Sequence, residues 1–226
     1  MKRLFLPIVL LLFAVSLKSQ NTTDLFTDKY TSGIDIFTDI IMDAPDGIDF
    51  RAFSPGVNIY GMRTYQVKES NFAFAIGLGL GIHNFFSNSV LNDTSGISYF
   101  NPIPEKAANG AKVDYKKSKL TLTYLDVPAE LRFKSASGFR MALGVKVGVL
   151  INAHTKYKGD DLITGKKTKL KEGYVPNIAT WRFGPTVQIG YKWINLIGYY
   201  SVTKVFDENA GPEIYPISVG LSLRPF

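Results

Sequence analysis

The stretch NFAFAIGLGLGIHNFF, residues 71–86, decides the fold. Large apolar side chains occupy every second position, and small residues lie between them. The large residues are Phe72, Phe74, Ile76, Leu78, Leu80 and Ile82. A period of two belongs to an extended strand, in which successive side chains point to opposite faces. The stretch therefore predicts a β-strand with one bulky apolar face and one face of glycine and alanine.

The same alternation recurs in FRMALGVKVGVLINAH (139–154) and ATWRFGPTVQIGYKW (179–193). Pro185, inside the second of these, removes a ladder donor and is expected at a bulge or a locally unpaired position. Eight such segments can be marked: 32–43, 55–66, 71–86, 119–134, 138–155, 178–192, 194–206 and 215–226. The longest exceed the usual five or six residues of globular strands, whereas a membrane-spanning strand needs roughly 9–11.

Long and short connections alternate between these segments. The short ones follow residues 66, 134 and 192, and the others are longer. Transmembrane barrels have short periplasmic turns and long external loops, and an even strand number returns both chain ends to one side. The pattern predicts an all-β fold, an eight-stranded antiparallel up-and-down transmembrane β-barrel.

The first residues, MKRLFLPIVLLLFAVSLKSQ, have a basic start at Lys2 and Arg3 and then an apolar run too short to span a bilayer as a helix. We expect a signal peptide at 1–19 and an outer-membrane β-barrel domain at 20–226. Without Lys2, Arg3 and Lys18 the net charge of +7 becomes +4, too small to indicate a nucleic-acid partner. The chain has no cysteine, which excludes disulfides and thiolate metal sites. No cofactor and no metal are expected.

The bulky face of the strands is expected to meet lipid, because an apolar barrel exterior is stable only there. The alternative is a soluble, lipocalin-like barrel with the large residues inside. In the transmembrane arrangement, charges of both signs fall on the inner face. The expected lumen ion network comprises Asp35, Asp39, Asp126, Glu130, Arg132, Arg140, Lys146, Arg182 and Arg224. Eight strands leave an interior that side chains just fill, so the hypothesis is a closed barrel.

Leu120, Leu122 and Tyr124 are out of phase with the outward set of Leu125 and Val127, which implies a β-bulge near Tyr124. Aromatic residues near strand ends are candidates for interfacial girdles. They are Tyr124, Phe133, Tyr191, Trp193, Tyr199, Tyr200 and Phe206. Phe226, the last residue, resembles the terminal aromatic signal that barrel-assembly machinery reads.

Two stretches carry a family resemblance. TYLDVPAELRFK (123–134), followed by a turn and GFRMALGVKVGVLINAHTKYK, resembles the PorT-like outer-membrane β-barrel family of Bacteroidota, as does the tail from Trp181. The resemblance covers about 119–226 well and 55–86 more loosely. It implies an outer-membrane location and an eight-stranded barrel. The namesake of the family is linked to type IX secretion, but most members have no assigned role.

Few residues suggest chemistry. His83 and His154 are expected on the inner face at the external ends of their strands, where a serine such as Ser87 or Ser89 and an acid could form a lipid hydrolase site. With Asp160 or Asp161 the two histidines could instead bind a metal. Lining of the lumen is the simpler interpretation of both histidines.

The segment HTKYKGDDLITGKKTKLKEG (154–173) carries six lysines, so an external basic rim could meet lipopolysaccharide phosphates, or it could be a solvated loop. The expected function is a non-enzymatic structural or accessory component of the envelope, in the cell outer membrane. A secretion-related role is included. The expected partners are the lipid bilayer, lipopolysaccharide, the barrel-assembly machinery and an unidentified envelope protein. A lipid-modifying hydrolase and a small-solute channel are the alternatives.

Overall fold

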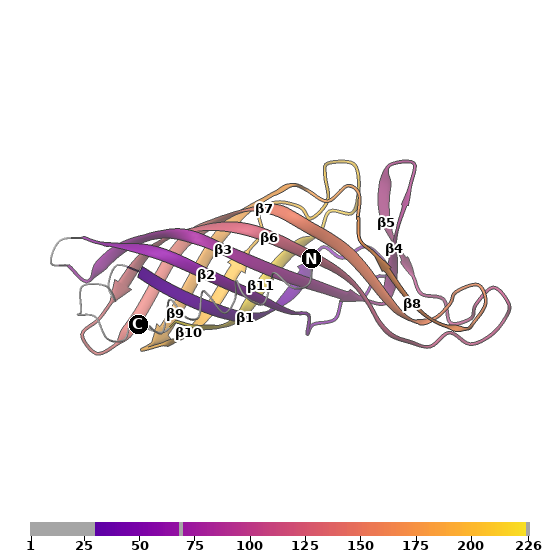
Figure 1. Cartoon of the computed structure of the whole chain (residues 1–226), viewed down its shortest axis with the longest axis horizontal. Helices are drawn as coiled ribbons and strands as arrows, with labels where there is room; N and C mark the ends of the chain where they lie inside the picture. The colour runs from indigo at the N-terminus through magenta and orange to yellow at the C-terminus, as the bar shows by residue number, and fades with distance from the viewer. Residues whose placement is uncertain (1–29, 68–69, 225–226) are drawn as a thin grey trace, which may run out of the picture.

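The computed structural model describes residues 30–67 and 70–224, and it contains eleven strands (Figure 1). The strands are β1 (Tyr30–Met42), β2 (Pro55–Gln66), β3 (Phe72–Ser87), β4 (Ser89–Thr94), β5 (Ile97–Pro102), β6 (Tyr115–Lys134), β7 (Phe139–Asp160), β8 (Lys167–Glu172), β9 (Trp181–Tyr191), β10 (Ile194–Tyr200) and β11 (Tyr215–Leu223). In these residues no helix has the length and apolar character to cross a membrane.

Eight of the strands close into an antiparallel barrel, which confirms the predicted fold. Their order is β6-β3-β2-β1-β11-β10-β9-β7, and a pairing of β6 with β7 completes the ring. The first and last strands pair from Ile34↔Leu223 to Met42↔Tyr215. Since closure gives every strand two neighbours, the barrel has no open edge along the ring.

The expected signal peptide, residues 1–19, and Phe226 lie outside the described residues.

The alternating lengths of the connections place the short turns at one end of the barrel and the long loops at the other (Figure 1). The expected segment 194–206 is too long, because β10 ends at Tyr200. Beyond this point Val205 and Phe206 turn into an apolar core instead of continuing the strand.

That core lies where the loops meet the barrel. It brings together residues of β3, β6 and the loops that follow β8 and β10: Phe85, Leu120, Leu122, Tyr124, Val175, Ile178, Val205, Phe206 and Ile214. Phe50, between β1 and β2, and Phe100, in β5, pack against it, and their rings stand edge to face at 5.3 Å. The long-loop end of the barrel is therefore covered by an apolar layer.

Three strands lie outside the barrel and were not predicted. The β4–β5 hairpin is in the loop that follows β3, and β8 pairs with the end of β7 from Thr155↔Glu172 to Asp160↔Lys167. The sequence of β8, KTKLKE, has no apolar face, which is why a search for apolar alternation passes over it.

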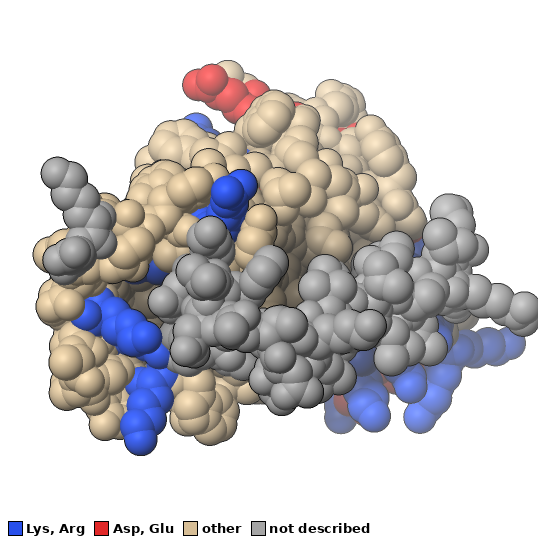
Figure 2. All heavy atoms as spheres, turned by 60° about the vertical axis from the view of Figure 1, so that its left-hand side comes forward, with Lys and Arg blue, Asp and Glu red and all other residues tan. Residues whose placement is uncertain are grey.

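The outward faces of the barrel strands are apolar, as the alternation predicts. Exposed residues of this wall include Leu78, Leu131, Leu143, Val145, Phe183, Ile189, Leu196 and Leu221. Figure 2, in which the short-turn end comes forward, shows a largely tan surface, with blue side chains mostly in its lower half and red ones at its top. An apolar wall around a charged interior is the arrangement of a barrel in lipid.

The irregularity near Tyr124 is present, but the extra residue is on the partner strand. Thr123 pairs with Asn152 and Tyr124 with Leu150, so Ile151 of β7 is inserted. The alternation of β6 therefore continues unbroken. Leu120, Leu122 and Tyr124 keep their side chains inside with Asp126, and the out-of-phase residues belong to the core rather than to the lipid face.

Pro185 occupies the second of its two expected environments. On one side it pairs with Val145 of β7 in continuous register. On the other side the pairing of β9 with β10 stops at Tyr199↔Thr186, so Pro185 has no partner in β10. Because its neighbour on the β10 side has already left the ladder, the missing N–H costs no strand hydrogen bond there.

Candidate functional site

The inner surface of the barrel carries a set of buried charges. Carboxylates and cations share the space, which is what burial of charge requires. The buried members are Asp35, Asp39, Asp126, Glu130, Lys146, Arg182 and Arg224, and Arg132 is partly buried beside them. Strand alternation places all of them inside, since their neighbours in sequence form the apolar wall.

Arg182 and Asp126 form the central pair of this network. Arg182 Nη2 donates to Asp126 Oδ2 at 2.8 Å, and Nε donates to Oδ1 at 3.3 Å. The guanidinium also lies 3.9 Å from the centre of the Tyr124 ring. With a further bond from Nη2 to Oδ1 at 3.0 Å, three hydrogen bonds and a ring contact hold a cation that would otherwise be buried without compensation.

His83 joins this pair to a second carboxylate. Arg182 Nη1 lies 2.7 Å from His83 Nε2, and His83 Nδ1 lies 2.9 Å from Asp39 Oδ2. Arginine can only donate, so Nε2 accepts and the ring proton sits on Nδ1, from which it is donated to Asp39. Ser218 Oγ donates to the other oxygen of Asp39 at 2.6 Å. His83 is therefore neutral, and both its nitrogens are engaged.

A second group of charges lies nearer the short turns and is centred on Glu130. Arg132 Nε donates to Glu130 Oε2 at 2.9 Å, Arg224 Nη2 lies 3.5 Å from the same oxygen, and Gln188 Nε2 donates to Oε1 at 3.1 Å. Arg224 also donates to Gln188 Oε1 at 2.5 Å and to Tyr60 Oη at 3.2 Å. These contacts cross-link β2, β6, β9 and the end of β11.

Asp35 and Lys146 lie between the two groups. Asn58 Nδ2 donates to Asp35 Oδ2 at 3.3 Å, and the ammonium of Lys146 lies 4.0 Å from the centre of the Tyr199 ring. The space left at this level is a cavity of about 40 Å³. Side chains thus fill most of the middle of the barrel.

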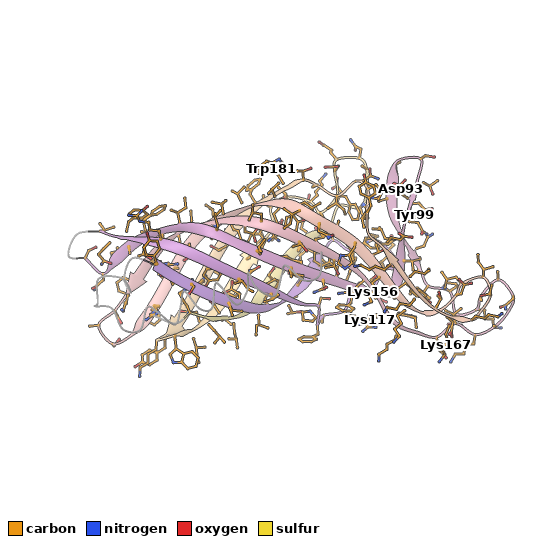
Figure 3. The ribbon with its side chains drawn as sticks, viewed as in Figure 1. Asp93, Tyr99, Lys117, Lys156, Lys167 and Trp181 are labelled. Atoms are coloured by element: carbon orange, nitrogen blue, oxygen red, sulfur yellow. The ribbon has the colours of Figure 1, made fainter. Side chains whose placement is uncertain are left out.

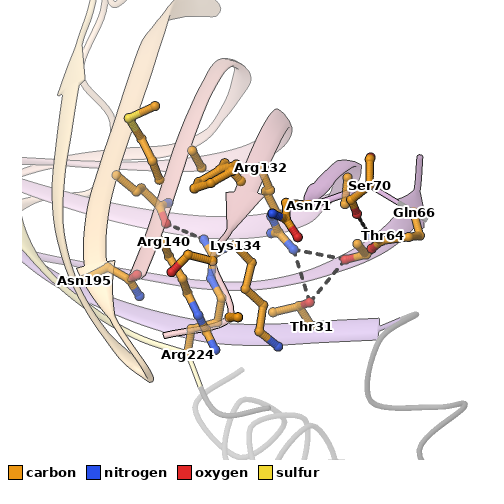
Figure 4. Close-up of a pocket in the computed structure, with 17 residues that line it drawn as sticks. Thr31, Thr64, Gln66, Ser70, Asn71, Arg132, Lys134, Arg140, Asn195 and Arg224 are labelled. Carbon is orange, nitrogen blue, oxygen red and sulfur yellow. Dashed lines mark hydrogen bonds between the residues drawn. The ribbon is translucent and has the colours of Figure 1, made fainter. Parts of the chain in front are cut away.

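A larger pocket of about 340 Å³ opens at the short-turn end (Figure 4). Arg132, Lys134, Arg140 and Arg224 line it, and none of its described lining residues is acidic. Arg132 Nη1 donates to Thr64 Oγ1 at 3.0 Å and to Thr31 at 3.2 Å, which fixes the guanidinium in the wall. The lining suits an anionic group, because guanidinium forks bind carboxylates and phosphates.

Arg140 lies at the mouth of the pocket, near Arg132 and Arg224. It is half-buried at the start of β7 and lines this pocket rather than the middle of the barrel. The nine residues expected in the lumen ion network therefore lie in the lumen, around Arg182 and around Glu130, except for Arg140, which is at the mouth of the pocket.

Four of the seven girdle candidates face outward: Phe133, Tyr191, Trp193 and Tyr200. The other three lie inside, and their expected place was wrong. Tyr124 and Phe206 belong to the apolar core, and the Tyr199 ring lies against the ammonium of Lys146 inside the lumen. Tyr124 and Tyr199 follow the inner alternation of their strands, whereas Phe206 lies in a loop that folds back over the barrel.

The two histidines do not meet. His83 is inside, but the inserted Ile151 reverses the alternation of β7, so that Ala153 packs on the core and His154 pairs with Thr121 on the opposite face. Ser87 and Ser89 are buried and bond to one another at 2.8 Å. Among the described residues no cluster of three His, Cys, Asp or Glu side chains could hold a metal ion.

Several polar partners in the lumen were not predicted as site residues: Asn58, Tyr60, Gln188, Ser218 and Ser222. His83 lines the lumen, in agreement with its simpler interpretation. All occupy inner positions of their strands. The alternation identifies such positions, but it does not say which of them hydrogen-bond, since this depends on which strands lie across the barrel from each other.

The sequence matches the family described as "Outer membrane protein beta-barrel domain" over residues 19–207, and no curated protein matches it. Among solved structures it is similar to Ail, the attachment invasion locus protein of Yersinia pestis, with 12% identity, a TM-score of 0.41 and coverage of 87% of this chain and 98% of that one. A structure of Ail with the heparin analogue sucrose octasulfate is similar at 12% identity and a TM-score of 0.40, with coverage of 87% of this chain and 97% of that one.

The family match spans most of the barrel described above, from before β1 to the loop that follows β10. The chain therefore belongs to the outer membrane protein beta-barrel domain family and resides in the outer membrane.

Proposed function

We propose that the protein is a closed, non-enzymatic barrel that serves as a structural or accessory component of the envelope. The observation that carries this proposal is the obstruction of the interior at two levels. The Arg182–Asp126–His83–Asp39 contacts cross the middle, and the apolar core covers the long-loop end. An ion that moved through the barrel would have to break the buried ion pairs in the middle and then cross the apolar core. Both steps cost free energy, because they leave charges buried without partners.

The hydrolase alternative has no support from the geometry of the histidines. His83 is 1% exposed and already binds Asp39 and Arg182, so it is not placed to activate a serine. His154 lies on the opposite face, where Lys119, Lys156 and Lys171 surround it, and burial followed by these lysines lowers its pKa. A triad needs a histidine that is oriented by an acid and within reach of the nucleophile.

The pocket at the short-turn end supports the accessory role. It is open to the periplasmic side in the orientation that short turns indicate, and its cationic lining would receive an acidic segment of an envelope protein. The finer assignment to the PorT-like family of Bacteroidota, with its secretion-related role, is part of this proposal and rests on the TYLDVPAELRFK stretch. Recognition of Phe226 by the barrel-assembly machinery stays a prediction.

Planar bilayer recording tests whether the barrel is closed. The purified full chain, refolded into lipid, should give no stable conductance steps, because the interior is obstructed at two levels. Heat-modifiable migration on gels would verify that the inserted protein is folded. Long-lived, reproducible steps from folded protein would contradict the proposal and favour the channel.

A site-specific photo-crosslinker tests the accessory role in cells. Placed at Asn71 on the pocket rim, it should capture an envelope protein, whereas the same group at Leu143 on the apolar wall should capture none. Equal capture at both positions, or none at Asn71 in folded protein, would argue against a partner at this pocket.

A further inference from the structure

Beyond the barrel, β6, β7 and β8 continue as a three-stranded sheet that carries rows of lysines. Lys117 pairs with Lys158, which pairs with Lys169; in the adjacent row Lys119 pairs with Lys156, which pairs with Lys171. Figure 3 labels Lys117 and Lys156 where these strands leave the barrel, with Lys167 further out. We call these six residues, Lys117, Lys119, Lys156, Lys158, Lys169 and Lys171, the lysine face.

All six share one face of the sheet, since paired residues point the same way and the two rows are two positions apart. The residues between the rows, Ser118, Tyr157 and Leu170, point to the other face. Neither lysine row contains an acid. On the same face, Asp160 pairs with Lys167 only in the next row outward. The positive charge of this face is therefore concentrated rather than interleaved.

Such a face is unfavourable on its own, because like charges placed directly opposite on a sheet repel. Lys169 is the foremost cause of a lowered pKa at Lys156, and burial followed by Lys117 and Lys156 lowers the pKa of Lys119. Lysines on an edge strand can serve to prevent aggregation. That explains the lysines of β8 but not those of β7, which is paired on both sides.

The lysine face continues the lipid-facing surface of the barrel. The last exposed apolar residue on β7 is Ile151, and Lys156 follows five residues later, about 16 Å along the strand and less in height because strands tilt. Lysine side chains reach back towards a membrane surface along their alkyl stems. We therefore expect these ammonium groups at the level of the lipid headgroups, beside the barrel rather than at its loop tips; that of Lys119 also donates to Asn84 Oδ1.

We propose that the lysine face binds the phosphate groups of lipopolysaccharide molecules packed beside the barrel. Lateral placement just above the apolar wall favours this occupant over a soluble polyanion, which would approach the loop tips from outside. Anionic phosphates between the rows replace repulsion with charge-assisted hydrogen bonds. The extension of β6 and β7 by β8 then serves to present a wide cationic surface to the headgroups.

The test compares two variants that each remove two lysine charges. K156Q/K169Q alters the lysine face, and K106Q/K112Q alters a loop bridge outside it. Each protein, in lipid nanodiscs, is titrated with purified lipopolysaccharide and with the same material after dephosphorylation. We expect K156Q/K169Q to weaken binding of the phosphorylated form about tenfold or more, since each lysine near an anionic surface contributes roughly fivefold. K106Q/K112Q should change it less than twofold.

An arginine variant, a folding control and a pH titration complete the test. K156R/K169R should retain binding, and heat-modifiable migration shows whether each variant is folded. Binding by the unaltered protein should weaken as pH rises from 7.5 to 9.5, because lysines with a lowered pKa lose their charge earlier than ordinary ones. Equal losses in the two glutamine variants, no effect of dephosphorylation, or binding of heparin in preference to lipopolysaccharide would each overturn the proposal.

Discussion

At the scale of single residues, the interior depends on small side chains beside large charged ones. A Cβ at Gly81 would lie 2.6 Å from Asn58 Oδ1 and 2.8 Å from Asp126 Oδ2. At Gly148 it would collide with Asp126 and Arg182. The inner-face glycines that interrupt the apolar alternation are therefore what allows the ion pair to fit in an eight-stranded lumen.

Asp126→Asn tests how much this pair contributes. The change leaves Arg182 buried with its counter-charge removed, so we expect the free energy of unfolding to fall by about 3–5 kcal/mol. Urea titration of the refolded protein in lipid vesicles, followed by tryptophan fluorescence, measures it. Asp46→Asn, at an exposed loop position, should change it by less than about 0.5 kcal/mol. Equal stability of the two variants would contradict the assigned role of the pair.

At the scale of elements, a single inserted residue, Ile151, reverses which side chains of β7 point into the barrel. Before Ile151 the even-numbered residues point into the lumen; after it the odd-numbered ones do, and the even-numbered His154, Lys156 and Lys158 move to the outer side. The bulge thus allows one strand to supply Lys146 to the lumen and two lysines to the lysine face.

The apolar core offers a prediction at this scale. Phe206→Ala removes a ring that is 2% exposed, so we expect a local loss of about 3–5 kcal/mol in the packing of the long loops. Limited proteolysis should then cut within 201–214, while the barrel keeps its heat-modifiable migration. Phe53→Ala, where the ring is 75% exposed, is the control and should leave the cleavage rate unchanged. Similar cleavage of both variants would rule out a covering role for Phe206.

At the scale of the whole molecule, one apolar band encircles the barrel and its width sets the position in the membrane. The chain has two tryptophans. Trp181 is the first residue of β9 (labelled in Figure 3), and Trp193 lies in the turn after β9; they are 63% and 53% exposed. Ten strand residues tilted in a barrel span about the 25 Å of a typical apolar band. Each indole is therefore expected near one membrane interface.

Fluorescence quenching by brominated lipids measures this placement. The single-tryptophan variants W181F and W193F should both be quenched more by bromine near the glycerol end of the acyl chain than by bromine near the methyl end. Each variant controls for the other, since the barrel and the lipid are the same. Stronger quenching of either tryptophan by the deep bromine would mean that the band lies elsewhere on the wall.

The sequence by itself determined the barrel, its strand number, its lipid face and the set of inward charges. These follow from alternation and connection length, which are local properties that a backbone of period two obeys wherever it lies. Only the tertiary structure decided that Arg182 meets Asp126 and His83, that Tyr199 and Phe206 turn inside, and that His154 faces outward. Such contacts depend on which strands face each other across the closed ring, on how the loops fold over it and on one inserted residue in β7. Six lysines spread over 55 positions of sequence become one surface only when three strands take their register.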